Sequence, residues 1–307
     1  MKVAIIDLGT NTFNILIADI KKGQKPDMLL KTKSSVMLGG EGLMTGFLSD
    51  KAFARSYAVL RDYHSVIKDF HCEQIYAFGT SAIRNAQNSE HFINKVEREL
   101  NIKIVPISNQ QESMYIFKAI QQAVPMDNEN YLIIDIGGSN NELVIGNGDN
   151  ILWNCSYDLG SARLLEIFKP SDPITQPEIA KLHAYFDDTM QNFNETIAKY
   201  PIKYIYGSSG AFDSFAEMIF QNKFKYPQPI NAKNFSFTAD DFDNIYTQLN
   251  TLPREQRIMI PGLETLRKDT IIASSNFVKY ILNKTKVKQI TQSSYAFIEG
   301  VAFSLSN

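Results

Sequence analysis

Two short segments of the chain share a pattern that suits phosphate chemistry. Each places an aspartate after an apolar run, followed by one apolar residue, glycine and small polar residues. The segments are Ile6-Asp7-Leu8-Gly9-Thr10-Asn11-Thr12 and Ile134-Asp135-Ile136-Gly137-Gly138-Ser139-Asn140. A tight glycine turn between two strands presents backbone N–H groups that can hold phosphate oxygens, and small hydroxyl or amide side chains add donors without bulk. We therefore expect both turns to bind phosphate.

The aspartates of the two segments, Asp7 and Asp135, stand at the mouths of these turns. A carboxylate at such a position can hold a divalent cation that bridges the protein to a phosphate. One Asp-X-Gly turn is equally consistent with an ordinary hairpin. Two turns with the same layout favour the phosphate interpretation.

Three further charged residues each have a structural and a functional interpretation. Glu112, at the start of a helix, either complements the helix dipole or orients and deprotonates an attacking water. Arg84 is either a solvated surface residue or a clamp that holds phosphate through its planar guanidinium. Glu142 either binds a metal ion through water or is an exposed strand carboxylate, depending on which face of its strand it takes.

The elements that must position these residues follow from the spacing of apolar residues. Apolar runs before and after each glycine turn predict two hairpins about 128 residues apart, and this long repeat indicates two related domains in tandem. Residues 50–70, 90–100 and 110–122 have helical spacing, and residues 102–107 have that of a strand.

Other segments are marked by glycine and proline. A loop is expected around Gly39, Gly40 and Gly42, and a third glycine turn at 206–211 follows a short strand. Residues 222–240, which contain two prolines, are predicted to form a loop. The remainder is expected to be mostly helical, with one strand at 287–291.

Composition limits the kinds of partner. The chain has 31 basic and 33 acidic residues and a net charge of -2, so it lacks the electrostatic footprint of a nucleic-acid-binding protein. No run of about 18 apolar residues is present, and we expect no membrane partner. The amino terminus lacks the pattern of a signal peptide, and the two cysteines, Cys72 and Cys155, are isolated. A cytoplasmic location is therefore expected.

Further segments extend the two glycine turns into an ordered set of motifs. They are Gly79-Thr80-Ser81-Ala82-Ile83-Arg84-Asn85-Ala86, Ile107-Ser108-Asn109-Gln110-Gln111-Glu112, Gly160-Ser161-Ala162-Arg163-Leu164, Gly207-Ser208-Ser209-Gly210, Pro261-Gly262-Leu263 with Arg267-Lys268-Asp269, and Tyr295-Ala296-Phe297-Ile298-Glu299-Gly300. In this order, and over nearly the whole chain, the set resembles the exopolyphosphatase / guanosine pentaphosphate phosphohydrolase (Ppx/GppA) family.

This resemblance implies an α/β fold, the two-domain actin-like ATPase superfold of acetate kinase, sugar kinases, heat-shock ATPases and actin. Each domain would carry a ribonuclease H-like motif, with a mixed sheet flanked by helices. We expect domains at 1–122 and 123–307, a C-terminal helix at about 295–307 that packs back on the first, and an active site in the cleft between the domains.

The family also implies an activity and a set of site residues. The expected activity is hydrolysis of the terminal phosphate of inorganic polyphosphate, a phosphoanhydride hydrolase reaction that uses Mg²⁺ or another divalent cation. Guanosine pentaphosphate is the alternative substrate, with a role in the stringent response, and a homodimer is also considered. Carried over by position, Glu112 is the catalytic carboxylate, and Asp135 and Glu142, with Asp7, are on the metal side. The expected phosphate-binding residues are Gly9, Thr10, Asn11, Thr12, Arg84, Gly137, Gly138, Ser139 and Asn140.

The chain departs from the family pattern near the phosphate path. The family usually reads Gly-Gly-Gly-Ser-Thr where this chain has Gly137-Gly138-Ser139-Asn140-Asn141. Gln111 replaces the first glutamate of a usual pair, and Asn109 replaces a glycine. These changes bear on substrate choice and rate more than on the fold.

Two rival functions remain open at the level of sequence. A kinase or ATPase of the same superfold would need a nucleotide pocket around Gly207–Gly210. A non-catalytic sensor would bind polyphosphate or a guanosine polyphosphate without releasing phosphate, and the altered segment Ser139–Asn141 motivates this alternative.

Overall fold

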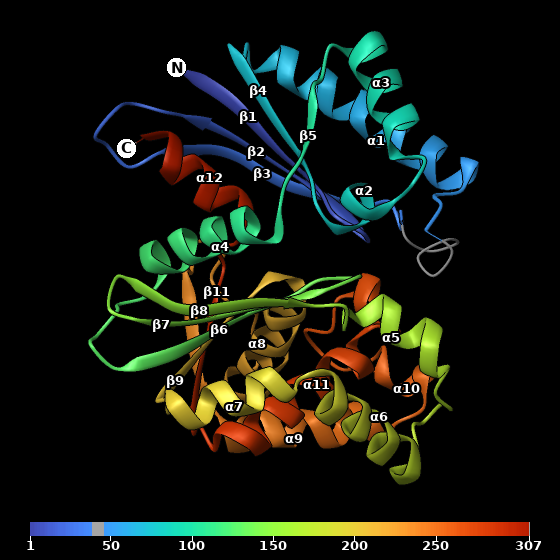
Figure 1. Cartoon of the computed structure of the whole chain (residues 1–307), viewed down its shortest axis with the longest axis vertical. Coiled ribbons are helices and arrows are strands. Elements are labelled where there is room, and N and C mark those ends of the chain that lie inside the picture. Colours follow the sequence, from blue (N-terminus) through green and yellow to red (C-terminus); the bar gives the residue numbers. More distant parts are fainter. Residues whose placement is uncertain (39–45, 307) are drawn as a thin grey trace. The chain divides into compact units, whose positions relative to one another are not determined.

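The computed structural model describes residues 1–38 and 46–306, so the loop expected around Gly39, Gly40 and Gly42 lies outside the described residues. The chain divides into two compact units (Figure 1). The first unit comprises Met1–Ala119, Gly137–Ser139 and the residues from Ala296 onward. The second unit comprises Ile120–Ile136 and Asn140–Tyr295.

The first unit contains a five-stranded sheet in the order β3-β2-β1-β4-β5. Its strands are β1 (Lys2–Leu8), β2 (Thr12–Asp19), β3 (Asp27–Ser35), β4 (Gln74–Gly79) and β5 (Ile104–Pro106). Strands β1, β2 and β3 pair antiparallel, whereas β1, β4 and β5 pair parallel. Because the parallel strands β1, β4 and β5 run in one direction, their carboxyl ends, and the motifs that follow them, lie at the same edge of the sheet.

Helices cover both faces of this first sheet (Figure 1). They are α1 (Asp50–Asp69), α2 (Ser81–Asn85), α3 (Ser89–Leu100), α4 (Asn109–Ala123) and α12 (Phe297–Ser306). Ala4, Ile6 and Leu8 share one apolar core with residues of α1 and α3, while α12 packs against β1 and β2. Successive residues of a strand point to opposite faces, so β1 needs an almost continuous apolar run.

The second unit contains a six-stranded sheet in the order β10-β11-β9-β6-β7-β8. Its strands are β6 (Asn130–Ile136), β7 (Asn141–Asn147), β8 (Asn150–Tyr157), β9 (Tyr204–Ser208), β10 (Asn234–Thr238) and β11 (Gln289–Ser293). Strands β6, β7 and β8 form an antiparallel meander, and β6, β9 and β11 pair parallel. Three antiparallel strands followed by parallel ones therefore occur in both sheets, which is the arrangement of the ribonuclease H-like motif. The predicted fold class is confirmed.

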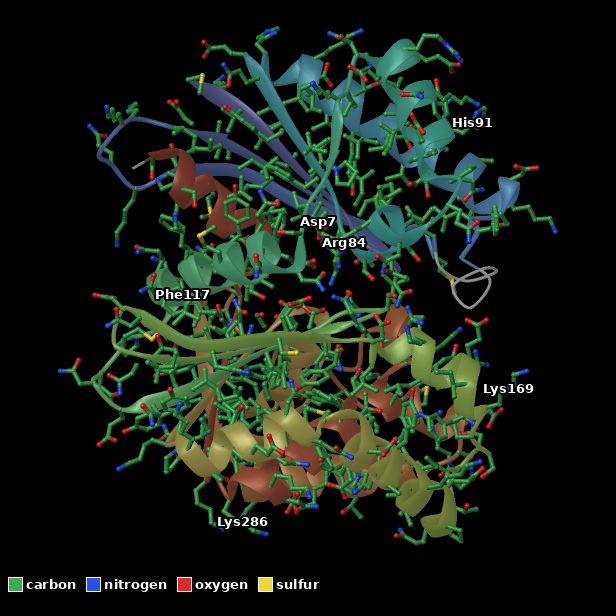
Figure 2. The ribbon with its side chains drawn as sticks, in the orientation of Figure 1. Asp7, Arg84, His91, Phe117, Lys169 and Lys286 are labelled. Carbon is green, nitrogen blue, oxygen red and sulfur yellow. The ribbon has the colours of Figure 1, made fainter. Side chains whose placement is uncertain are left out.

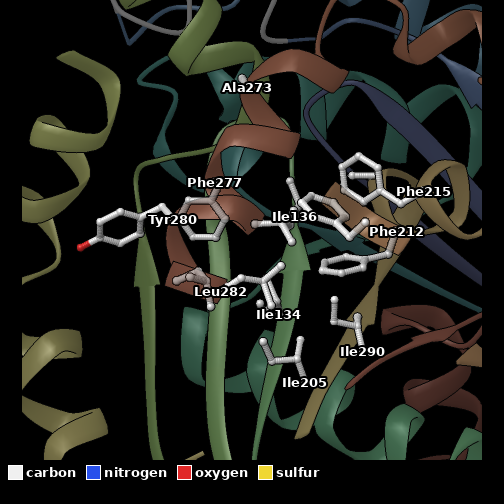
Figure 3. Packing of buried hydrophobic residues seen from close by; sticks show 14 of the residues in the cluster. Ile134, Ile136, Ile205, Phe212, Phe215, Ala273, Phe277, Tyr280, Leu282 and Ile290 are labelled. Atoms are coloured by element: carbon white, nitrogen blue, oxygen red, sulfur yellow. The ribbon is translucent and has the colours of Figure 1, made fainter. Parts of the chain in front are cut away.

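The helices of the second unit enclose its main core. They are α5 (Ser161–Phe168), α6 (Gln176–Thr189), α7 (Gln191–Lys199), α8 (Ser209–Phe224), α9 (Ala239–Thr251), α10 (Arg254–Arg257), the 3₁₀ helix η1 (Thr265–Arg267) and α11 (Ile271–Thr285). Figure 3 shows Phe212, Phe215 and Phe277 with the isoleucines of β6 in this core. Such dense packing gives the turns at the strand ends a rigid support.

One sequence prediction needs correction. Residues 222–240 were predicted to form a loop, but they contain the end of α8, the strand β10 and the first residues of α9. The two prolines precede the strand and leave its pairing with β11 intact, since a proline outside the ladder removes no strand hydrogen bond. In the described ranges, no helix has both the length and the apolar character needed to cross a membrane.

Candidate active site

The first glycine turn joins β1 to β2. A Cβ atom added to Gly9 would lie 2.7 Å from the Thr12 carbonyl oxygen, so only glycine fits there. The Asn11 carbonyl oxygen accepts hydrogen bonds from the backbone N–H groups of Val36 (2.9 Å) and Met37 (3.0 Å). These contacts fix the shape of the turn.

The second glycine turn contacts the first. Residues Gly137–Ser139 belong to the first unit although the strands on either side belong to the second. A Cβ atom added to Gly138 would lie 2.7 Å from both the Cγ and the Nδ2 of Asn11. The two predicted phosphate turns are therefore neighbours, with a glycine at their closest approach.

Two charged residues lie on elements that follow parallel strands of the same sheet. Thr80, just before α2, donates its hydroxyl to the Leu8 carbonyl oxygen at 3.3 Å, which ties α2 to the end of β1. Arg84 on α2 donates from Nη1 to the Ile107 carbonyl oxygen (2.8 Å) and to Glu112 Oε2 on α4 (3.1 Å). The Arg84 and Glu112 side chains are only 18% and 13% exposed, so Arg84 is not a solvated surface residue. Figure 2 labels Asp7 and Arg84.

Arg84 keeps part of its hydrogen-bonding capacity. Its Nε and Nη2 have no partner among residues 1–38 and 46–306, whereas Nη1 holds Glu112 in place. A guanidinium carries five N–H donors in a planar fork, so one nitrogen can fix the carboxylate while the others face an anion. The pair can therefore offer a base and a phosphate clamp from the same cluster.

Gln111, one of the departures from the family pattern, has a defined structural role. The Ser108 backbone N–H donates to Gln111 Oε1 at 3.0 Å, and the Gln111 backbone N–H donates to the Ser108 hydroxyl oxygen at 3.2 Å. This reciprocal pair is a capping box at the start of α4, and it accepts glutamine as readily as glutamate. The Ser-X-X-Gln spacing would have identified it from the sequence.

A row of polar residues crosses four strands of the second sheet at one level. Strand register aligns Ser208 of β9, Asp135 of β6, Glu142 of β7 and Ser156 of β8. Residues aligned in this way point to the same face of a sheet. The Ser208 hydroxyl donates to Asp135, and burial raises the pKa of Asp135 above its ordinary value. Glu142 is 2% exposed, which rules out the exposed-carboxylate interpretation.

The equivalent row of the first sheet has a different charge. There Asp7 is aligned with Asn14, whose Nδ2 donates to the Asp7 carboxylate at 2.9 Å, and Asn14 is aligned with Lys33. The first row thus pairs one acid with one base. The second row aligns two carboxylates and contains no Lys or Arg of its own. Burial raises the pKa of Asp135, Arg267 from outside the row counteracts part of that rise, and a bound cation would offset more of the repulsion.

A divalent cation fits the second row. Mg²⁺ commonly takes one or two carboxylates and completes its shell with water and substrate phosphates. Asp135 and Glu142 supply two carboxylates on adjacent strands. In the described part of the chain, no group of three or more His, Cys, Asp or Glu side chains is arranged to hold a metal by itself, so the missing ligands would come from water and phosphate.

The asparagines that depart from the family pattern also have partners. Asn140 donates from Nδ2 to Glu142 Oε1 (2.6 Å) and to the Ser156 hydroxyl oxygen (2.8 Å). Asn141 donates from Nδ2 to the Leu159 carbonyl oxygen at 2.9 Å. Both amide nitrogens therefore organise the second sheet. The expected contact of Asn140 with phosphate stays a prediction, which its backbone N–H remains suited to make.

The third glycine turn is filled by side chains. A Cβ atom on Gly207 would overlap the Phe212 ring, and one on Gly210 would overlap the Arg267 guanidinium. Gly262, with φ +88°, lets its loop pack on the backbone of α8. The space over Gly207 and Gly210 is thus occupied by the protein, which disfavours the nucleotide pocket that a kinase would need. Arg267 and Ser208 were not singled out as site residues, because their proximity to Asp135 depends on this packing.

Two sheets that share three antiparallel strands followed by parallel ones, each with an Asp-X-Gly turn in its first hairpin, define a protein of the actin-like superfold. The sequence model of the Ppx/GppA phosphatase family matches residues 16–307, and the chain belongs to this family.

Several relatives and solved structures are similar to the chain. A bifunctional 3-dehydroquinate synthase/phosphatase of Fusobacterium nucleatum is 27% identical over 288 residues, which cover 91% of this chain and 43% of that protein. Exopolyphosphatase 1 of Mycobacterium bovis is 25% identical over 64% of this chain and 57% of its own length. The chain thus spans about half the length of these relatives.

Among solved structures, an exopolyphosphatase from Cytophaga hutchinsonii is 32% identical, with a TM-score of 0.96 over 100% of this chain and 98% of that one. The Aquifex aeolicus member of the Ppx/GppA family is 26% identical, with a TM-score of 0.82 over 99% and 97%.

Proposed function

We propose that the chain is an exopolyphosphatase that hydrolyses the terminal phosphoanhydride bond of inorganic polyphosphate. The observation that supports it most is the cluster of the first unit, where the two glycine turns abut and the Arg84–Glu112 pair follows neighbouring parallel strands. The exopolyphosphatase names of the Mycobacterium bovis relative and of the Cytophaga hutchinsonii structure agree with this function.

The proposed chemistry is in-line attack of water on the terminal phosphorus. Glu112 orients the water and takes its proton while the new P–O bond forms. The bridging P–O bond breaks, which releases inorganic phosphate and a polyphosphate shorter by one unit. The backbone amides of the two turns and the remaining N–H groups of Arg84 hold the non-bridging oxygens.

Asp135 and Glu142 would hold Mg²⁺, which, when bound, neutralises charge on the phosphate chain. Asp7 is held by Asn14 and is the third residue that we assign to the metal side. The cytoplasmic location, the homodimer and the placement of the active site in a cleft between domains remain predictions.

The proposal is tested by phosphate release from long polyphosphate, short polyphosphate and guanosine pentaphosphate, each with and without Mg²⁺. We expect Mg²⁺-dependent release that is fastest from polyphosphate. Faster release from guanosine pentaphosphate would reassign the substrate. Tight binding of polyphosphate without release would instead favour the sensor.

The assignment of the base is tested by Glu112→Gln. Loss of a general base lowers kcat by ~10²–10⁴-fold. Glu99→Gln is the matched control, because Glu99 also pairs with an arginine, Arg98, at 2.8 Å on the same unit. Equal turnover in the Glu112 and Glu99 variants would show that Glu112 is not the base.

A further inference from the structure

The loop between α8 and β10 carries an exposed apolar surface that the proposed chemistry does not use. Phe224 is 48% exposed, Tyr226 56% and Ile230 101%. The Ala232 backbone N–H donates to the Pro229 carbonyl oxygen at 2.9 Å, which places Ile230 at the tip of a turn. Three large apolar side chains are thus exposed within residues 224–230, and exposed apolar clusters mark interaction sites.

This surface is held in shape from beneath. The Phe220 ring packs against Phe224 (centroids 4.6 Å apart) and Tyr226 (5.4 Å). The Gln228 backbone N–H donates to the Glu217 carboxylate at 3.3 Å. Phe224 and Tyr226 are therefore held in place by Phe220, and we call Phe224, Tyr226 and Ile230 the apolar tip.

Lysines flank the apolar tip in the sequence, and one carboxylate, Glu217, lies beneath it. Residues 218–239 contain three lysines and no Asp or Glu, in a chain whose net charge is -2. Lys223 is paired with Asp241, but Lys225 donates only to the Asn222 carbonyl oxygen, and Lys233 lies over the Tyr295 ring. Lys225 and Lys233 thus have no acidic partner within residues 1–38 and 46–306.

We propose that the apolar tip docks on the surface of an anionic lipid bilayer. Phe224, Tyr226 and Ile230 would enter the boundary between headgroups and acyl chains, while Lys225 and Lys233 face lipid phosphates. A bilayer accepts exposed apolar side chains without a complementary shape. A protein partner is less suited, because protein interfaces are depleted in lysine and need a broad, complementary face. Binding of this kind requires no membrane-spanning helix.

The test is co-sedimentation of the full chain with vesicles of phosphatidylcholine, alone or mixed with phosphatidylserine. We expect binding only to the mixed vesicles, weakening as salt is added. Ile230→Ser should weaken it about 10-fold, since a buried isoleucine side chain is lost. The double variant Lys225→Glu with Lys233→Glu should weaken it by more than about 10-fold.

Two variants in the same unit serve as matched controls. Met259→Ser removes another exposed apolar side chain (76% exposed), and Lys286→Glu reverses an exposed lysine labelled in Figure 2. Both should bind mixed vesicles as the unaltered chain does. Absence of binding at low salt, or equal losses in the control variants, would overturn the proposal. It would also be overturned if Ile230→Ser changed the oligomeric mass of the protein in solution, because the apolar tip would then be a contact between copies of the chain.

Discussion

Replacing Gly138 by alanine tests whether the two glycine turns abut as the structure indicates. The added Cβ would lie 2.7 Å from two atoms of the Asn11 side chain. Ordinary contact begins at 3.4 Å, so either the Asn11 side chain must rotate aside or the turns must separate by about 0.7 Å. Val36 and Met37 hold the backbone of Asn11 through its carbonyl oxygen, so the displacement falls mainly on the Asn11 side chain, which we expect to contact phosphate.

The displacement determines the size of the effect. A misplacement of ~1 Å in a site that works by positioning can cost ~10²-fold in rate. Overpacking of this kind lowers the free energy of unfolding by about 1–3 kcal/mol. We therefore expect Gly138→Ala to fold, to lose ~10²-fold in kcat for polyphosphate and to unfold at a slightly lower temperature.

The assay is steady-state phosphate release together with thermal unfolding. Gly23→Ala is the matched control, because Gly23 has φ +73° and open space around it. Its strained backbone costs about 1–2 kcal/mol of stability without touching the turns. The double variant, Asn11→Ala with Gly138→Ala, should show a smaller loss of kcat than the combined losses of the two single variants. Strict additivity, or an equal loss in Gly23→Ala, would refute the contact between the turns.

Three further predictions concern stability and are checked by thermal unfolding. Gln111→Ala removes half of the capping box of α4 and should cost about 0.3–1.5 kcal/mol, whereas Gln111→Glu should be nearly neutral. Hydrogen bonds from Ser171 and Thr175 lower the pKa of Glu178 from 4.5 to about 2. Ionised Glu178 thus stabilises the fold above pH 4.5, and the stability difference from Glu178→Gln should shrink as the pH falls from 4.5 toward 2. Arg257 is 3% exposed and donates to the Leu252 carbonyl oxygen, so Arg257→Met should cost about 1–3 kcal/mol through the acceptor left unsatisfied.

The sequence was most informative where local spacing determines structure. The repeated Asp-X-Gly pattern predicted both hairpins, because an apolar run closed by a glycine turn has few other folded forms. The helix predicted at 50–70 is α1, at Asp50–Asp69. Strand β10 was missed because its five residues follow a proline-rich stretch and gain their structure from pairing with β11.

The candidate site was predictable only in part. The turns and Glu112 follow from local motifs, whereas the polar row of the second sheet depends on register between strands far apart in the chain. Ser156 and Ser208 align with Glu142 and Asp135 only once β6 to β9 have paired. No local pattern predicts such a long-range alignment.

The first unit combines segments that lie far apart in the sequence, and this affects the order in which the unit can fold during synthesis. Glu299 of α12 is fully buried and pairs with Lys31 at 2.5 Å, and Gly300 lets α12 pack closely on the Tyr115 backbone. During synthesis, Lys31 and Tyr115 leave the ribosome long before Glu299 and Gly300 exist. Until α12 is made, β1 and β2 therefore lack the helix that packs against them.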